Sequence, residues 1–127
     1  PERLEGKSVE GDHVSDCLFC KIGSGQIPAK VVLQDDEVLA FDDINPQAPV
    51  HVLVIPKRHV ARLNEAGAGD QALMGCLLET AALVAGKKGI AESGYRVVVN
   101  TGRDGGQTVF HLHLHVLGGR PMDWPPG

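Results

Sequence analysis

The segment His111-Leu112-His113-Leu114-His115-Val116-Leu117 places a histidine at every second position with an apolar residue in between. Side chains of a β-strand alternate between the two faces of a sheet. The segment therefore predicts a strand with its histidines on one face and its apolar residues in the core. Alternate residues lie about 6.5–7 Å apart along a strand, so the histidines flank one another without stacking. A ligand over His113 would touch both neighbouring histidines.

Three interpretations of this histidine face compete. The first is a polar strand face that happens to use histidine. The second is a metal site, because His-x-His on a strand can chelate one ion. The third is a site of phosphoryl chemistry, with one imidazole as nucleophile and others as donors. The upstream segment, residues 100–108 (NTGRDGGQT), favours the third. Its glycines allow the backbone to turn and present N–H groups to an anion, and Gln107 and Thr108 add side-chain donors. It is not a Walker loop, because the lysine and the following helix are missing.

The rest of the chain predicts an α+β fold with a mostly antiparallel sheet, because a short helix, strands, a long helix and more strands follow one another. Asp16 is expected to cap the short helix near Cys17, with Leu18, Phe19 and Ile22 as its apolar face. Hydrophobic periodicity and turn residues predict strands at 30–33, 38–41, 50–55, 95–100 and 108–117, and a helix at 71–88. Two apolar rows mark this helix: Leu73, Leu77, Ala81 and Val84, and Met74, Leu78 and Ala82. Cys76 within it is interpreted as a core residue.

Composition limits the classes of function. The 127 residues make one domain, which we place at 16–127 after a flexible, polar tail at 1–15. A net charge of −4 argues against non-specific binding to nucleic acid or acidic membranes, and no apolar run reaches the length of a membrane span. Three cysteines argue against a disulfide framework and for a reducing compartment. We expect a cytoplasmic location, and an organellar one after removal of a targeting segment stays open.

The stretch QTVFHLHLHVLGGR (107–120) resembles the motif of the histidine triad (HIT) family, and the resemblance extends from DCLFCKI (16–22) through FDDINPQAPVHVLVIPKRH (41–59) to the final WPPG. The intact triad and the tail resemble the Hint branch, the histidine triad nucleotide-binding proteins that act as purine nucleoside phosphoramidases. Branches with glutamine at the first or third triad position are less similar. The resemblance implies a five-stranded, mostly antiparallel sheet with one long and one short helix. It also implies a homodimer whose sheets join.

The same resemblance implies roles for individual residues. His113 is the nucleophile, with His115, Gln107, Thr108, Asn100 and the backbone of Gly106 around the phosphate. His51 is a partner of the triad. Thr108 stands where many relatives have serine, and Phe110 where close relatives often have tyrosine. The nucleoside pocket is formed by Phe19, Ile22, Phe41, Ile44 and Leu53, with Asp43 accepting ribose hydroxyls. From the residues alone, these apolar side chains belong to the core, and Asp43 is solvated or caps a turn.

The pair Cys17-x-x-Cys20 by itself fits zinc, redox chemistry or neither, although the βαβ context of a thioredoxin-like site is missing. The resemblance implies a structural zinc held by Cys17, Cys20, His59 and His111, and catalysis that needs no metal. It also brings Trp124 to the active site of the partner subunit. The function expected is hydrolysis of AMP–amine conjugates. Two alternatives stay open: a non-catalytic nucleotide- or zinc-binding regulator, and a dinucleoside polyphosphate hydrolase.

Overall fold

The computed structural model describes residues 16–127, so the tail predicted at residues 1–15 lies outside it. One five-stranded sheet has the strand order β1-β2-β3-β5-β4, and each neighbouring pair is antiparallel. This confirms the α+β prediction. No helix among the described residues is long and apolar enough to cross a membrane. The elements are α1 (Leu18–Gly23), β1 (Val31–Gln34), β2 (Val38–Asp42), β3 (Val50–Pro56), the 3-10 turns η2 (Leu63–Glu65) and η3 (Ala68–Asp70), α2 (Gln71–Lys87), β4 (Tyr95–Val98) and β5 (Leu114–Gly118).

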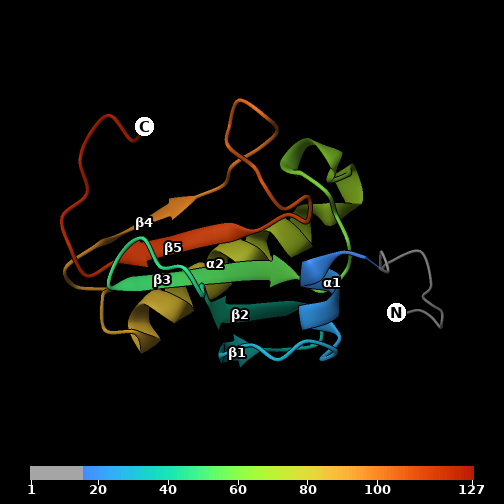
Figure 1. Cartoon of the computed structure of the whole chain (residues 1–127), viewed down its shortest axis with the longest axis horizontal. Coiled ribbons are helices and arrows are strands. Elements are labelled where there is room, and N and C mark those ends of the chain that lie inside the picture. Colours follow the sequence, from blue (N-terminus) through green and yellow to red (C-terminus); the bar gives the residue numbers. More distant parts are fainter. Residues whose placement is uncertain (1–15) are drawn as a thin grey trace.

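The two faces of the sheet are covered unequally. The long helix α2 lies behind the sheet in Figure 1 and closes the main core. The short helix α1 lies in front, over one end of β3. A smaller apolar cluster fills this front face, made of Phe19, Leu39, Phe41, Leu53 and Ile55. The front face beyond α1 is therefore left available for a site.

The start of α1 differs from the prediction. Its N-cap is Cys17, whose sulfur accepts a hydrogen bond from the Cys20 N–H at 3.4 Å, and Asp16 is exposed. Leu18 was expected on the apolar face but is 46% exposed, whereas Phe19 and Cys20 are buried. A helix of six residues buries only one narrow side, and that side is the one that carries Phe19.

The last strand, β5, is shorter than predicted. It begins at Leu114 rather than Thr108, and β4 ends at Val98 rather than Asn100. Ladder pairing with β3 runs from Val50–Gly118 to Val54–Leu114. Two residues further along, the partner of Leu112 would be Pro56, which has no N–H to donate. Leu112 instead donates its N–H to the Val60 carbonyl.

Helix α2 buries one of its two predicted apolar rows. Leu77 is 1% exposed and Val84 is 0% exposed, whereas Leu78 is 60% exposed and Ala82 is also exposed. One sheet can cover only one side of a helix, so Leu78 and Ala82 face outward, whereas Met74 in the same row packs partly against the core. Cys76 is half-buried and packs against the core, as predicted.

Candidate active site

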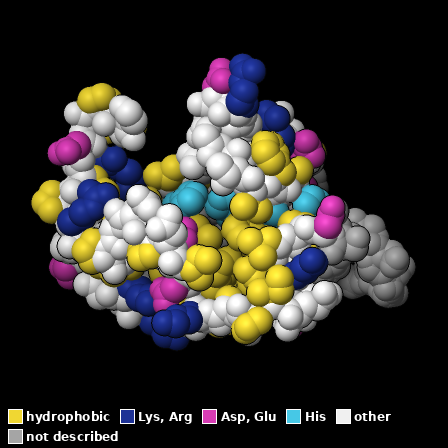
Figure 2. Space-filling view, viewed as in Figure 1, with side chains coloured by type: hydrophobic (Ala, Val, Ile, Leu, Met, Phe, Trp, Pro, Cys, Tyr) yellow, Lys and Arg dark blue, Asp and Glu magenta, His cyan; other side chains and the backbone are white. Residues whose placement is uncertain are grey.

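The three triad histidines lie on the α1 face of the sheet, as the alternation predicts. His111 is 0% exposed and His113 is 7% exposed, and the Phe19 ring meets both imidazoles edge to face, with ring centroids 6.0 and 5.1 Å apart. The rings of His113 and His115 are 4.9 Å apart and inclined by 60°, so they are not stacked. Figure 2 shows the histidines at the bottom of a hollow on this face. Leu112, Leu114 and Val116 point the other way into the core.

The hydrogen bonds of His113 determine which ring nitrogen carries its proton. Nδ1 lies 2.7 Å from the carbonyl oxygen of His111. A carbonyl only accepts, so Nδ1 carries the proton and Nε2 keeps its lone pair. Burial lowers the pKa of His113 below its ordinary 6.5, which keeps the ring neutral. Nε2 of His113 thus carries an unprotonated lone pair at neutral pH, as a nucleophile requires.

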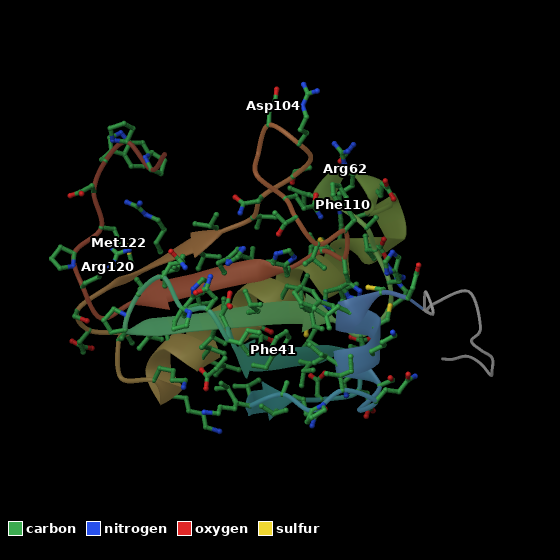
Figure 3. The ribbon with its side chains drawn as sticks, in the orientation of Figure 1. Phe41, Arg62, Asp104, Phe110, Arg120 and Met122 are labelled. Carbon is green, nitrogen blue, oxygen red and sulfur yellow. The ribbon has the colours of Figure 1, made fainter. Side chains whose placement is uncertain are left out.

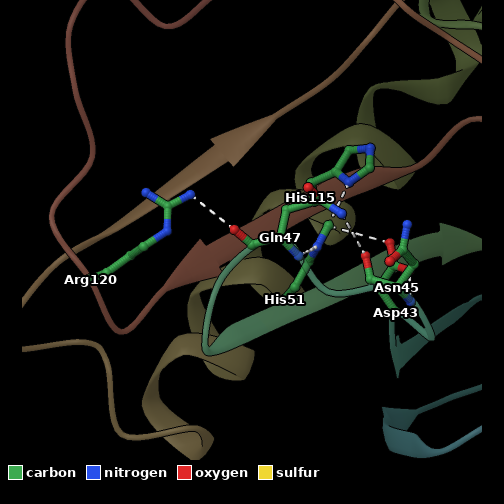
Figure 4. A network of polar contacts seen from close by, with 6 residues as sticks. All are labelled: Asp43, Asn45, Gln47, His51, His115 and Arg120. Atoms are coloured by element: carbon green, nitrogen blue, oxygen red, sulfur yellow. Dashed lines mark hydrogen bonds and ion pairs between the residues drawn. The ribbon is translucent and has the colours of Figure 1, made fainter.

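His115 carries its proton on the other ring nitrogen, and residues outside the triad determine this. The Gln47 N–H donates to His51 Nδ1 at 3.0 Å, so the proton of a neutral His51 sits on Nε2. That nitrogen lies 2.9 Å from His115 Nδ1 and 3.4 Å from Asp43 Oδ2, as Figure 4 shows. His115 therefore accepts at Nδ1 and carries its proton on Nε2, which is buried and has no hydrogen-bond partner among the described residues. Burial, with the neighbouring histidines, lowers the pKa of His115 to about 4.

The four predicted metal ligands meet at the N-terminal end of α1. Cys17 Sγ lies 3.4 Å and Cys20 Sγ 3.5 Å from His111 Nδ1, and Cys20 Sγ lies 3.4 Å from His59 Nδ1. A tetrahedral zinc separates its sulfur and nitrogen ligands by about 3.6 Å. His111 Nε2 donates to the Pro56 carbonyl at 2.7 Å, which leaves Nδ1 unprotonated toward the thiols, as metal-binding histidines require. The four side chains fit a zinc ion.

A second group, Asp43, His51 and His115, also brings three potential ligand atoms together. Its hydrogen bonds do not fit a metal. His51 Nδ1 accepts from a backbone N–H, so the ring proton must sit on Nε2, the nitrogen that would bind the metal. Coordination through Nε2 would require either the loss of that proton, which gives an imidazolate, or its transfer to Nδ1, where it would clash with the backbone N–H. This group is better described as a hydrogen-bond chain that ends at His115.

The loop upstream of the triad departs from the predicted phosphate cradle at Gln107. The Gln107 side chain accepts from the Gly102 N–H and donates to the carbonyls of Ala61 and Val109. Its amide is fully engaged, and the Gly106 N–H is used within the turn, toward Arg103. Gln107 therefore holds the loop in place and has no N–H left for an anion. Thr108 is exposed, and continuing the β4–β5 register from Val98–His115 would set Asn100 beside His113.

The predicted nucleoside-pocket residues separate into two groups. Phe19, Phe41 and Leu53 are buried together with Ile22 beside them, and the Phe19 and Phe41 rings meet edge to face at 5.6 Å. Ile44 does not join them and is 101% exposed. Asp43 caps its own loop through the Asn45 N–H and turns its other oxygen toward His51. Phe19, Phe41 and Leu53 are core residues and Asp43 caps a turn, as the residues alone predict, whereas Ile44 is not in the core. Their role toward a nucleoside stays a prediction.

Three aspects of the site have weak or no signals in the sequence. Gln47 acts through its backbone N–H, which leaves no trace in residue type. Arg120 donates to the Gln47 carbonyl at 2.9 Å from the segment after β5. Phe110 is 47% exposed and lies just before β5, at the opposite end of that strand from Arg120, as Figure 3 shows.

The sequence model of the HIT domain family matches residues 24–122 of this chain. The chain belongs to the HIT domain family. An uncharacterised HIT-like protein of Synechococcus elongatus is 57% identical over 112 residues, which are 88% of this chain and 97% of the relative. The crystal structure of a HIT family hydrolase from Legionella pneumophila is 53% identical, with a TM-score of 0.86 over 88% of this chain and all (100%) of that one.

A more distant structure of the same family carries a more specific description. The histidine triad nucleotide-binding protein of Candida albicans is 31% identical, with a TM-score of 0.74 over 86% of this chain and 82% of that one. In the present chain, the range matched by the HIT domain family, residues 24–122, includes the whole triad, His51 and His59. Cys17, Cys20 and Trp124 lie outside this range. The fold of the family is thus shown for the histidine site, and the cysteine pair is a feature of the segment before it.

Proposed function

We propose that the protein is a nucleotide hydrolase that cleaves the P–N bond of purine nucleoside phosphoramidates, as in the Hint branch. The observation that carries this proposal is the pair of opposite tautomers at His113 and His115. One ring presents a lone pair and the next presents an N–H, side by side on the same face. The descriptions of the relatives from Legionella, a hydrolase, and Candida, a nucleotide-binding protein, support the same class of chemistry.

In the proposed reaction His113 Nε2 attacks the α-phosphorus of an AMP–amine conjugate. The N–P bond to His113 forms as the P–N bond to the amine breaks, and the amine leaves with a proton taken from a water molecule, which becomes hydroxide. A second water then attacks the nucleotidyl-histidine, releases AMP and restores the lone pair on His113. The proton that this water loses neutralises the hydroxide, so one water is consumed overall. The His115 Nε2–H donates to a phosphoryl oxygen in both steps and stabilises its charge.

We infer that Cys17, Cys20, His59 and His111 hold a structural zinc. When bound, that ion would cross-link α1 to the segments that carry the two histidines. The His111 carbonyl is the acceptor for His113 Nδ1–H, so this cross-link would also support the nucleophile. Thiolates suit a reducing compartment, and we therefore propose a cytoplasmic location.

We also propose a homodimer. The outer edge of β4 is unpaired in the described chain, and free sheet edges favour pairing with another strand. Tyr95 on this strand is 38% exposed and Trp124 on the C-terminal segment is 82% exposed. A second subunit that continues the sheet at β4 would cover both, with the Trp124 segment near its active site.

The test is release of AMP from adenosine monophosphoramidate by the native protein, His113→Ala and His113→Asn, each with and without EDTA. We expect a fall in kcat of at least about 10⁴-fold in both variants, because the nucleophile is lost, and activity of the native protein that persists in EDTA. Equal rates in the three proteins would refute the mechanism. Tight AMP binding without turnover would favour the non-catalytic regulator, and a preference for dinucleoside polyphosphates in a substrate panel would favour that hydrolase class.

A further inference from the structure

The loop between β2 and β3, residues 43–49, contacts His51 but has no core of its own. Residues 44–47 are all exposed, so little apolar burial holds them in place. Inside the loop, the Asn45 N–H donates to Asp43 Oδ1 at 2.8 Å and Gln47 Nε2 donates to the Asn45 carbonyl at 3.1 Å. The loop contacts the site at both nitrogens of His51: the Gln47 N–H donates to Nδ1, and Asp43 Oδ2 lies 3.4 Å from Nε2. The position of Gln47 thus decides whether His51 receives that hydrogen bond.

Arg120 connects Gln47 to the rest of the molecule. Its Nη2 donates to the Gln47 carbonyl at 2.9 Å and its Nη1 to the Pro121 carbonyl at 3.1 Å. Figure 4 shows the resulting chain from Arg120 through Gln47 and His51 to His115. Besides His51, Arg120 is the one side chain from outside the loop that hydrogen-bonds to Gln47 within the described residues 16–127.

The backbone before Arg120 is shaped for this contact. Gly119 has a φ of +90°, and a Cβ atom there would lie 2.8 Å from Pro49 Cβ. A side chain at position 119 would therefore be strained and would push the loop away. Glycine at position 119 lets the chain turn directly against Pro49, the last residue of the loop, and the next residue, Arg120, then reaches the Gln47 carbonyl.

We propose that Arg120 is a positioning residue that fixes the tautomer of His115. By holding Gln47, it keeps the Gln47 N–H on His51 Nδ1, which places the His51 proton on Nε2. His115 must then accept at Nδ1 and carry its own proton on Nε2, the nitrogen that has no hydrogen-bond partner among the described residues. The effect on catalysis rests on the function proposed above, whereas the tautomer itself does not.

Loss of Arg120 would release this constraint. If Gln47 moves away, His51 can carry its proton on Nδ1 and accept from His115, which then turns a lone pair toward the phosphate. A donor to the phosphoryl oxygen would become a repulsive acceptor in part of the molecules. We expect kcat to fall about 10-fold with little change in KM, less than the loss of a whole oxyanion donor because the original tautomer stays partly populated.

The experiment compares the native protein with Arg120→Ala, Arg120→Lys and the control Arg96→Ala. Arg96 holds the same C-terminal segment, through the Asp123 carbonyl at 2.8 Å and the Trp124 ring at 6.0 Å, and none of its hydrogen bonds within residues 16–127 goes to the loop. The readouts are the ¹⁵N chemical shifts of the His115 and His51 ring nitrogens without substrate, and kcat and KM for adenosine monophosphoramidate. Circular dichroism checks that each variant is folded.

A shift of the His115 nitrogens toward the other tautomer in Arg120→Ala, a smaller shift in Arg120→Lys and none in Arg96→Ala would support the proposal. Native ¹⁵N shifts in Arg120→Ala, or equal changes in both alanine variants, would overturn it. If the native protein does not cleave the phosphoramidate, the proposed function fails, and the ¹⁵N shifts still decide the role of Arg120.

Discussion

At the scale of single residues, the site depends on where protons sit on otherwise identical side chains. His111, His113 and His115 occupy equivalent positions in the motif, but each ring has different partners: the Pro56 carbonyl and two thiols, the His111 carbonyl, and His51. A ring nitrogen that faces a carbonyl must carry a proton, and a ring nitrogen that accepts a hydrogen bond from an N–H cannot carry one. The three rings thereby differ in the nitrogen that each leaves unprotonated, which fits the roles in metal binding, attack and donation that we propose for them.

Burial of these rings predicts how stability depends on pH. The pKa of His115 is lowered from 6.5 to about 4 in the folded protein, so between these values the unfolded chain binds more protons than the folded one. The free energy of unfolding should therefore be highest above pH 6.5 and fall as the pH drops toward 4. Urea titrations at pH 7.5, 6 and 5 measure this fall, which should be smaller in His115→Gln. An equal fall in both proteins would show that His115 does not contribute.

Gln107 provides a second prediction for a single residue. Its buried amide satisfies the Gly102 N–H and the carbonyls of Ala61 and Val109. Gln107→Ala would leave these groups without partners and should lower the free energy of unfolding by about 2 kcal/mol. Urea unfolding measures this, with Thr108→Ala as the exposed neighbouring control, expected to change by less than about 0.5 kcal/mol. Native stability of Gln107→Ala combined with weaker AMP binding would instead restore the predicted phosphate contact.

At the scale of elements, the end of one strand sets the start of another. Pro56 ends β3 and cannot pair with Leu112, so the chain before β5 leaves the ladder. The freed Pro56 carbonyl accepts from His111. The first histidine is thereby turned toward the cysteines of α1, and the other two remain over the open face.

Helix α2 offers a matched pair of leucines for a test of packing. Leu77 is 1% exposed against the sheet, and Leu78 is 60% exposed on the outer side. Leu77→Ala should lower the free energy of unfolding by about 3 kcal/mol through loss of packing and a cavity, and Leu78→Ala by less than about 0.5 kcal/mol. Chemical denaturation of both variants at several protein concentrations measures this. A large, concentration-dependent loss in Leu78→Ala would show that another subunit covers the outer side of α2.

At the scale of the whole molecule, the cysteine–histidine cluster joins α1 to segments far along the chain. If zinc binds there, the folded state gains about 3 kcal/mol when free zinc exceeds its Kd roughly 100-fold. We expect one zinc per chain by elemental analysis and a lower Tm after chelation. Cys17→Ser combined with Cys20→Ser should lose the zinc, whereas the control Cys76→Ser, on α2, should keep it. A native protein purified with zinc in the medium that holds no metal would contradict this prediction.

The sequence by itself determined the α+β class, the strands and the common face of the three histidines, because alternation and helical periodicity are local consequences of backbone geometry. Resemblance to a known family added the cysteine–histidine cluster and the roles around the phosphate. Only the tertiary structure decided the engagement of Gln107, the exposure of Leu78 and Ile44, the early end of the β5 ladder, and the route from Arg120 to His115. These features depend on backbone N–H and carbonyl groups brought together from distant segments, and every residue type carries those groups. Residue identity therefore cannot reveal them, whereas the fold places each one.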